Sequence, residues 1–230
     1  MRYLYIKKSP QNQRQPAKQK LFSFGMVVVG FLLIISVTAP LFIYQFVVSP
    51  SFRPMVKPMV EQSVLGDQIQ SGVDYTRVSS WFPTAPRPTS LPSKITHYNL
   101  SIPKVRIDKA TVEIGGEDLK DSLIQYEGTA FPGQFGNTVI FGHSILPQFY
   151  NPKKYNTIFS LLPTLKIKDP IIIDFDGITY KYEIEQMTEV KPTDISILEQ
   201  RYDDSYLTLI TCVPPGTYLR RLAVRARLTK

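Results

Sequence analysis

The chain has 230 residues and a formal charge of +8, from 27 lysines and arginines against 19 aspartates and glutamates. Residues 1–20 contain six of these basic residues and no acidic one, so the rest of the chain is close to neutral. Because the excess charge is confined to the N-terminus, the composition gives no support for nucleic-acid binding by the remainder.

Residues 21–48 form an apolar stretch without a single Asp, Glu, Lys, Arg or His. A membrane-spanning helix needs about 20 mostly apolar residues, whereas the apolar region of a cleaved secretory signal has about 7–15. Pro40 directly after Ala39 makes a poor cleavage site. We therefore expect an uncleaved anchor, with a cleaved signal as the alternative. Basic residues precede this span and none follows it until Arg53, so the N-terminus is expected in the cytoplasm and the rest outside.

This reasoning divides the chain into four parts. Residues 1–20 are expected to be a basic cytoplasmic tail, 21–48 a transmembrane helix, 49–93 a proline-rich extracytoplasmic spacer and 94–230 one folded domain. Within the spacer, the adjacent aromatics Trp81 and Phe82 cap the domain, shield a groove or make an incidental packing contact, and the last is the simplest interpretation.

The domain of residues 94–230 is rich in short β-branched runs separated by turn residues. We expect strands at 95–102, 104–107, 110–114, 137–142, 170–175, 178–190, 206–211 and 221–228. Short helical stretches are expected at 119–125, 155–162 and 194–200, and Asp176-Gly177 predicts a tight hairpin turn. About eight strands in so short a domain predict an all-β fold with short helices, closed or nearly closed into a barrel.

Cys212, the chain's single cysteine, ends the apolar run of the seventh expected strand. Extracytoplasmic proteins use cysteines in pairs, so an unpaired one indicates either a free reactive thiol or an intermolecular bond. A free cysteine is also a small apolar residue that packs well in strands, and that role is the commoner one for a lone cysteine without other context.

Three further residues with suitable chemistry lie at strand ends. His143 follows Gly142 at the end of one strand, and Arg220 and Arg221 begin the strand after Cys212. A thiol that attacks an amide needs a base, an acid for the leaving amine and a donor for the oxyanion, and these residue types supply them. Residue alternation alone would place Arg221 in a solvated stripe, but the turn between the two strands lets it reach Cys212.

The motifs around these residues are together similar to those of the sortases, a family of membrane-anchored cysteine transpeptidases. The resemblance rests on TLITC at 208–212 with Arg221 nine residues later, on GNTVIFGH at 136–143, and on LSIPKVRI at 100–107. It covers essentially all of 99–228 and implies the eight-stranded sortase barrel. It also implies that Cys212 is the nucleophile, His143 the acid and base, Arg221 the substrate and oxyanion stabiliser, and Thr211 a helper at the oxyanion.

The reaction implied by the resemblance is cleavage of a sorting signal of the Leu-Pro-any-Thr-Gly type between Thr and Gly. The acyl group would pass through a thioester on Cys212 to an amine of a cell-wall precursor or a pilin lysine. No cofactor is implied, and no metal site transfers residue by residue.

No acidic-aromatic lid motif of the pilin-polymerising class precedes the domain, which favours an anchoring enzyme. The TCVPPG turn at 211–216, however, resembles other classes, so the class stays open.

Two other functions remain open at this point. One is a membrane-tethered β-barrel that only binds peptide or glycan and has an inert cysteine. The other is a cysteine peptidase that transfers the acyl group to water. Fold alone distinguishes neither from a transpeptidase.

Overall fold

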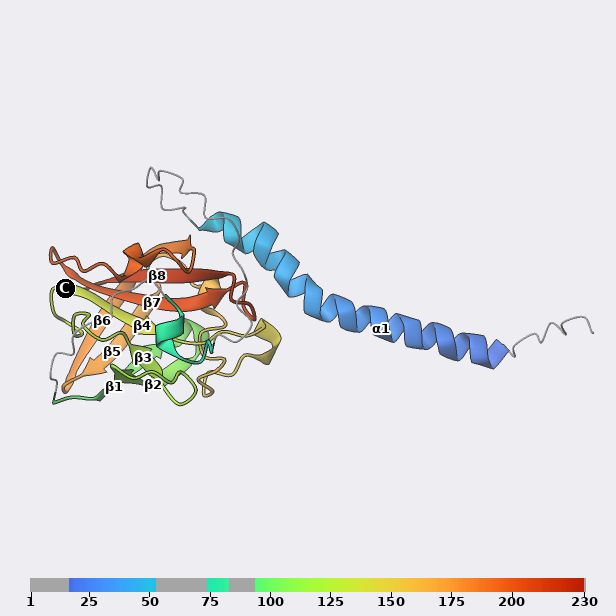
Figure 1. Ribbon diagram of the computed structural model, residues 1–230, viewed down its shortest axis with the longest axis horizontal. Helices are drawn as coiled ribbons and strands as arrows, with labels where there is room; N and C mark the ends of the chain where they lie inside the picture. The colour runs from blue at the N-terminus through green and yellow to red at the C-terminus, as the bar shows by residue number, and fades with distance from the viewer. Residues whose placement is uncertain (1–16, 53–73, 83–93, 230) are drawn as a thin grey trace, which may run out of the picture. The chain divides into compact units, whose positions relative to one another are not determined.

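The computed structural model describes residues 17–52, 74–82 and 94–229 (Figure 1). Most of the expected cytoplasmic tail and much of the expected spacer therefore lie outside the described residues. Two compact units make up the chain, residues 1–39 and 40–230.

The N-terminal helix α1 (Ala17–Ile43) continues through a π-helical turn (Tyr44–Val48) and a 3₁₀ turn (Ser49–Ser51). Its stretch Phe22–Ser51 has 30 residues and a mean hydropathy of 2.6. That length and composition fit a single-pass membrane anchor, as the sequence predicts, although a signal sequence has the same properties.

Eight strands form a closed barrel in the order β1-β2-β3-β4-β7-β8-β6-β5 (Figure 1). Their bounds are β1 (His97–Ile102), β2 (Ile107–Ile114), β3 (Leu123–Gln125), β4 (Gly136–Phe141), β5 (Pro170–Phe175), β6 (Ile178–Val190), β7 (Ser205–Val213) and β8 (Arg220–Leu228). The predicted all-β barrel with short helices is confirmed. The predicted hairpin is confirmed too, since Asp176 and Gly177 both have positive φ between β5 and β6, as a tight hairpin turn requires.

Three local predictions were wrong. Residues Pro103–Val105 form a 3₁₀ turn, so the strand expected at 104–107 does not exist separately from β2. The expected helix at 119–125 contains strand β3, and that at 155–162 consists of turns before a 3₁₀ turn at Leu162–Thr164. β3 shows no alternation because all three of its residues are buried, and a short apolar run of this kind does not distinguish strand from helix. The third expected helix is confirmed as the 3₁₀ helix Ile195–Leu198.

The pairing of β4 with β7 is parallel, with register from Gly136↔Ser205 to Phe141↔Ile210. Antiparallel pairing joins β7 to β8. The C-terminal ends of β4 and β7 therefore lie at the same end of the barrel, beside the start of β8.

Both faces of this part of the sheet are buried. On β7, Leu207, Leu209 and Val213 belong to the large core cluster together with Leu222 and Val224 of β8. The alternate β7 residues, Ile210 and Cys212, belong to a second and smaller cluster. We call this second set of residues the outer cluster: Val78, Trp81, Phe82, Leu119, Ile124, Val139, Phe141, Val190, Ile197, Ile210, Cys212 and Ala223. Because successive strand residues point to opposite faces, the outer cluster lies on the outer face of the barrel.

Candidate active site

Cys212 lies on the outer face of β7, directly opposite Arg221 of β8 in the antiparallel register. Its side chain is a free thiol that is only 1 % exposed. The thiol is thus packed inside the outer cluster, with a guanidinium from the neighbouring strand beside it.

His143 follows β4 at the end of the barrel where β7 carries Cys212, because β4 and β7 run parallel. The preceding Gly142 is required by close packing. A Cβ there would lie 2.5 Å from the ring of Phe159 and 2.6 Å from Leu123. Gly142 therefore makes room for the side chains of Phe159 and Leu123.

Arg221 is 1 % exposed although it carries a charge. One terminal nitrogen, Nη1, donates to the carbonyls of Tyr218 (3.0 Å) and Arg220 (3.3 Å), and the other, Nη2, donates to the carbonyl of Trp81 (3.3 Å). Its Nε has no hydrogen-bond partner among the described residues. Burial of an unpaired donor is costly, so this N–H is available to a group that enters the site.

Trp81 covers the site. Its indole is fully buried, with the guanidinium carbon of Arg221 5.2 Å from the ring centroid and the ring of His143 at 5.8 Å. The indole N–H donates to the carbonyl of Tyr75 (2.8 Å), and the Tyr75 ring stacks on Tyr218 at 4.2 Å. The segment that carries Trp81 is therefore held on the barrel at more than one point.

The interpretation of Trp81 and Phe82 as an incidental contact is wrong, because both belong to the outer cluster with Cys212. The alternative interpretation, in which the pair caps the domain or shields a groove, agrees with the position of Trp81 over Arg221. The available signal was the pair of adjacent aromatics in a region otherwise rich in Pro, Ser and Thr.

Burial controls the ionisation of the two titratable groups. Desolvation raises the pKa of the Cys212 thiol from its ordinary 9.0 to about 11, and the charge of Arg221 opposes this only in part. Desolvation lowers the pKa of His143, and the negative charges of Asp118 and Asp74 raise it by a smaller amount. With the site covered, both groups are therefore neutral near pH 7.

The other residues of interest are Thr211, Arg220 and His97, the second of the chain's two histidines. Thr211 faces the barrel interior, and its hydroxyl donates to the Gly142 carbonyl (2.8 Å). Arg220 is half exposed and pairs with Glu189 at 3.7 Å. His97 is exposed at the start of β1, where its Nδ1 lies 2.9 Å from the hydroxyl of Thr96. Of the sequence-predicted site residues, Cys212, Arg221 and His143 lie around Trp81.

Asn137 holds the connection between β6 and β7 in place through hydrogen bonds. Its side chain donates to the carbonyls of Ile197 (3.2 Å) and Glu199 (3.4 Å) and accepts from Thr208 (2.7 Å). In return, Gln200 accepts from the Asn137 N–H and donates to its carbonyl, both at 2.9 Å. This connection carries Ile197 into the outer cluster, so Asn137 helps to shape the surroundings of Cys212.

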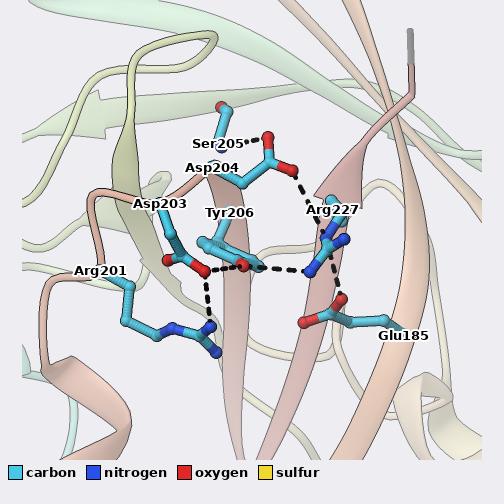
Figure 2. A network of polar contacts seen from close by, with 7 residues as sticks. All are labelled: Glu185, Arg201, Asp203, Asp204, Ser205, Tyr206 and Arg227. Carbon is cyan, nitrogen blue, oxygen red and sulfur yellow. Dashed lines mark hydrogen bonds and ion pairs between the residues drawn. The ribbon is translucent and has the colours of Figure 1, made fainter.

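A second polar network fixes the other end of β7 (Figure 2). The Tyr206 hydroxyl donates to Asp203 (3.0 Å) and accepts from Arg227 (3.1 Å), and Asp203 also pairs with Arg201 (2.8 Å). Arg227 in turn lies 3.3 Å from Glu185. These are mostly exposed contacts at the end of β7 remote from Cys212.

No group of three or more His, Cys, Asp or Glu side chains within residues 17–52, 74–82 and 94–229 is arranged to hold a metal ion. The described site brings together a thiol, an imidazole and a guanidinium.

Known proteins resemble this chain in sequence. Residues 100–229 match the sortase domain model. Sortase A of Staphylococcus aureus (strain NCTC 8325 / PS 47) is 30% identical over an alignment of 130 residues that covers 48% of this chain and 59% of that protein. The match thus spans less than two thirds of the relative.

Solved structures of sortases share the fold. Sortase A from Corynebacterium diphtheriae superposes with a TM-score of 0.51 at 31% identity, covering 60% of this chain and 62% of that one. The pilus-related sortase C of Group B Streptococcus gives a TM-score of 0.53 at 26% identity, covering 65% and 78%. The chain belongs to the sortase family, because the family model matches more than half of the chain and these solved structures share its barrel.

Proposed function

We propose that this protein is a membrane-anchored cysteine transpeptidase that cleaves a sorting signal of the Leu-Pro-any-Thr-Gly type between Thr and Gly. The single observation that carries the proposal is the parallel pairing of β4 with β7 beside the antiparallel pairing of β7 with β8. This pairing gathers a thiol, an imidazole and a buried guanidinium at one end of the barrel, with no disulfide partner for the thiol in the sequence.

In the first half of the reaction, Sγ of Cys212 attacks the threonine carbonyl carbon. The thiol proton passes to His143, the S–C bond forms, and the Thr–Gly C–N bond breaks as His143 returns the proton to the leaving amine. In the second half, an acceptor amine attacks the thioester carbon. The new C–N bond forms, the C–S bond breaks, and the proton lost by the amine returns through His143 to the thiolate.

Arg221 stabilises the oxyanion in both halves. Its Nε has no partner within the part of the chain that the structure describes, and its Nη2 contacts the carbonyl of Trp81. When the segment that carries Trp81 moves away, both N–H groups face the reacting carbonyl. A donor that the protein already holds in position needs no reorganisation when the oxyanion forms.

Substrate access requires displacement of Trp81, because Cys212 is packed beneath the outer cluster. Uncovering the thiol restores its contact with water and brings its pKa down from about 11 toward its ordinary value. The same step restores solvent to His143. The covered state therefore protects the thiol, and the uncovered state is the reactive one.

The partners follow from the same proposal. The substrates are proteins with a C-terminal sorting signal, and the acceptor is an amine of a cell-wall precursor or a pilin lysine. The N-terminus is cytoplasmic and the barrel extracytoplasmic, given the basic residues in 1–20 and the apolar stretch Phe22–Ser51. Protease added to intact cells should then remove the barrel but leave an N-terminal tag intact.

The decisive experiment incubates the full chain in detergent with a sorting-signal peptide, with and without an added amine. A transpeptidase gives the amine-linked product and a thioester on Cys212 that mass spectrometry detects. Hydrolysis alone in the presence of amine would identify a peptidase. Peptide binding without a thioester would identify a binding module with an inert cysteine, and either result would overturn the proposal.

A further inference from the structure

The parallel ladder between β4 and β7 stops just before the two residues that must react together. Its last pair is Phe141↔Ile210, and one further backbone bond runs from the Gly142 N–H to the Ile210 carbonyl (3.1 Å). Backbone pairing therefore ends at Gly142 and Ile210. Gly142 directly precedes His143, and Ile210 lies two residues before Cys212 on β7.

Two side-chain hydroxyls continue the pairing where the backbone ladder stops. The Thr211 hydroxyl donates to the Gly142 carbonyl (2.8 Å), and the Ser144 hydroxyl donates to the Cys212 carbonyl (2.6 Å). Both hydroxyls are buried. The residues on either side of His143 are thus each bonded to the end of β7, and one of these bonds reaches Cys212 itself.

The other hydrogen bonds of this stretch lead away from β7. The His143 carbonyl accepts from the Phe159 N–H (2.9 Å), and the Ile145 N–H donates to the Ser160 hydroxyl (2.9 Å). Among the bonds described for residues 143–145, the one from Ser144 connects this stretch directly to β7. Without it, the chain after Gly142 is held mainly by the segment around Phe159.

We propose that Ser144 is a positioning residue for acyl transfer, whose hydroxyl bond to the Cys212 carbonyl fixes the placement of the His143 imidazole relative to the thiol. This inference rests on the proposed function. Proton transfer requires donor and acceptor within hydrogen-bond reach, and a misplacement of about 1 Å can lower a rate about 100-fold. A hydroxyl that bonds to the nucleophile's own backbone gives that control without touching the substrate.

Ser144→Ala and Thr138→Val form the matched pair for a test. The Thr138 hydroxyl is also buried and lies on β4, but it donates to a backbone carbonyl outside β7, that of Ala130 (2.8 Å). Both substitutions thus remove one buried hydroxyl near the same strand. Only Ser144→Ala removes a contact with Cys212.

The experiment measures kcat, KM, the pH–rate profile and unfolding of each full-length variant in detergent, with the sorting-signal peptide and an amine. We expect Ser144→Ala to lower kcat about 10- to 100-fold at nearly unchanged KM, and to alter the spacing of the two limbs of the pH profile. Thr138→Val should leave kcat unchanged. Ser144→Thr, which keeps the hydroxyl, should recover most of the lost rate.

Three outcomes would overturn the positioning role. These are equal kcat values for Ser144→Ala and Thr138→Val, a change in KM alone, or a loss of kcat in Ser144→Ala that follows a matching loss of folded protein. Failure of the proposed function is distinguishable, because the unsubstituted protein would then form no thioester on Cys212. An active unsubstituted protein with an equally active Ser144→Ala variant refutes the role of Ser144 alone.

Discussion

The guanidinium of Arg221 lies over the indole of Trp81, with its central carbon 5.2 Å from the ring centroid, although 140 residues separate the two in the chain. A cation held on an aromatic face and hydrogen-bonded to that residue's carbonyl attaches the covering segment to the strand opposite Cys212. This contact makes the state of the thiol depend on the position of Trp81.

Replacing Trp81 with Ala should therefore expose Cys212. Because lost desolvation lowers the thiol pKa, and one pKa unit is a tenfold change in thiolate population, we expect alkylation by iodoacetamide at pH 7.5 to accelerate at least about tenfold. Mass spectrometry of the single cysteine measures the rate. Phe149→Ala is the control, because Phe149 is an exposed aromatic outside the outer cluster. Equal alkylation rates in the two variants would show that Trp81 does not limit access.

The buried thiol should also make stability depend on pH above 9. Burial raises the folded pKa of Cys212 to about 11, so the folded state holds the proton longer than the unfolded chain, which titrates near 9.0. Below pH 9 both states carry the neutral thiol, and the contribution is fully present. As the pH rises from 9 to 11, it is lost.

Comparison with Cys212→Ala isolates this effect. The free energy of unfolding of the unsubstituted protein should fall relative to that of the variant by about 2 to 3 kcal/mol between pH 9 and 11. Trp81, the single tryptophan, reports unfolding by fluorescence in urea titrations of both proteins. Parallel stability curves up to pH 11 would mean that the thiol has an ordinary pKa.

The two histidines should differ sharply in importance. His143→Gln removes the proposed acid and base, so acyl transfer should fall by about 10² to 10⁴. His97→Gln should leave the rate nearly unchanged, because His97 is exposed and contacts Thr96 rather than the outer cluster. Initial rates of amine-linked product formation measure both. A larger loss at His97 than at His143 would refute the assignment.

The neighbouring arginines offer a similar contrast. Lysine at position 221 keeps the charge but loses the planar fork that donates to three carbonyls and presents the unpaired Nε. We expect Arg221→Lys to lower the acylation rate about 10²- to 10³-fold. Arg220→Lys should have little effect, since Arg220 is half exposed and pairs with Glu189. Small and equal losses of acylation rate in the two variants would show that neither arginine stabilises the oxyanion.

Asn137 should matter for stability as well as for the site. Asn137→Ala leaves the buried carbonyl of Ile197 and the hydroxyl of Thr208 without a partner, at a cost of about 2 kcal/mol or more in unfolding free energy. Arg201→Ala, in the exposed network of Figure 2, should cost less than about 1 kcal/mol. Urea titrations of the two variants test the contrast. A larger loss for Arg201→Ala would show that the exposed network, and not Asn137, holds the connection.

Local sequence patterns were sufficient for much of the fold. The uncharged stretch at 21–48 predicts the apolar helix, because the spanning length follows directly from the rise per residue of a helix. The run at 178–190, rich in β-branched and aromatic residues, predicts β6 with its bounds, and Asp176-Gly177 predicts its turn. β3 escaped prediction because its three residues are buried on both faces and carry no period.

In the candidate site, too, local patterns predicted some features and left others undetermined. Residue types and motif spacing pointed to Cys212, His143 and Arg221, but alternation along β8 left Arg221 in an apparently solvated stripe. Arg225 and Arg227 of that stripe are indeed partly or largely exposed, whereas Arg221 is buried. The pattern of a strand determines which residues share a face, but what covers that face is decided by segments distant in the sequence. Here Trp81, from the expected spacer, covers Arg221 and Cys212, and only the tertiary structure could place it there.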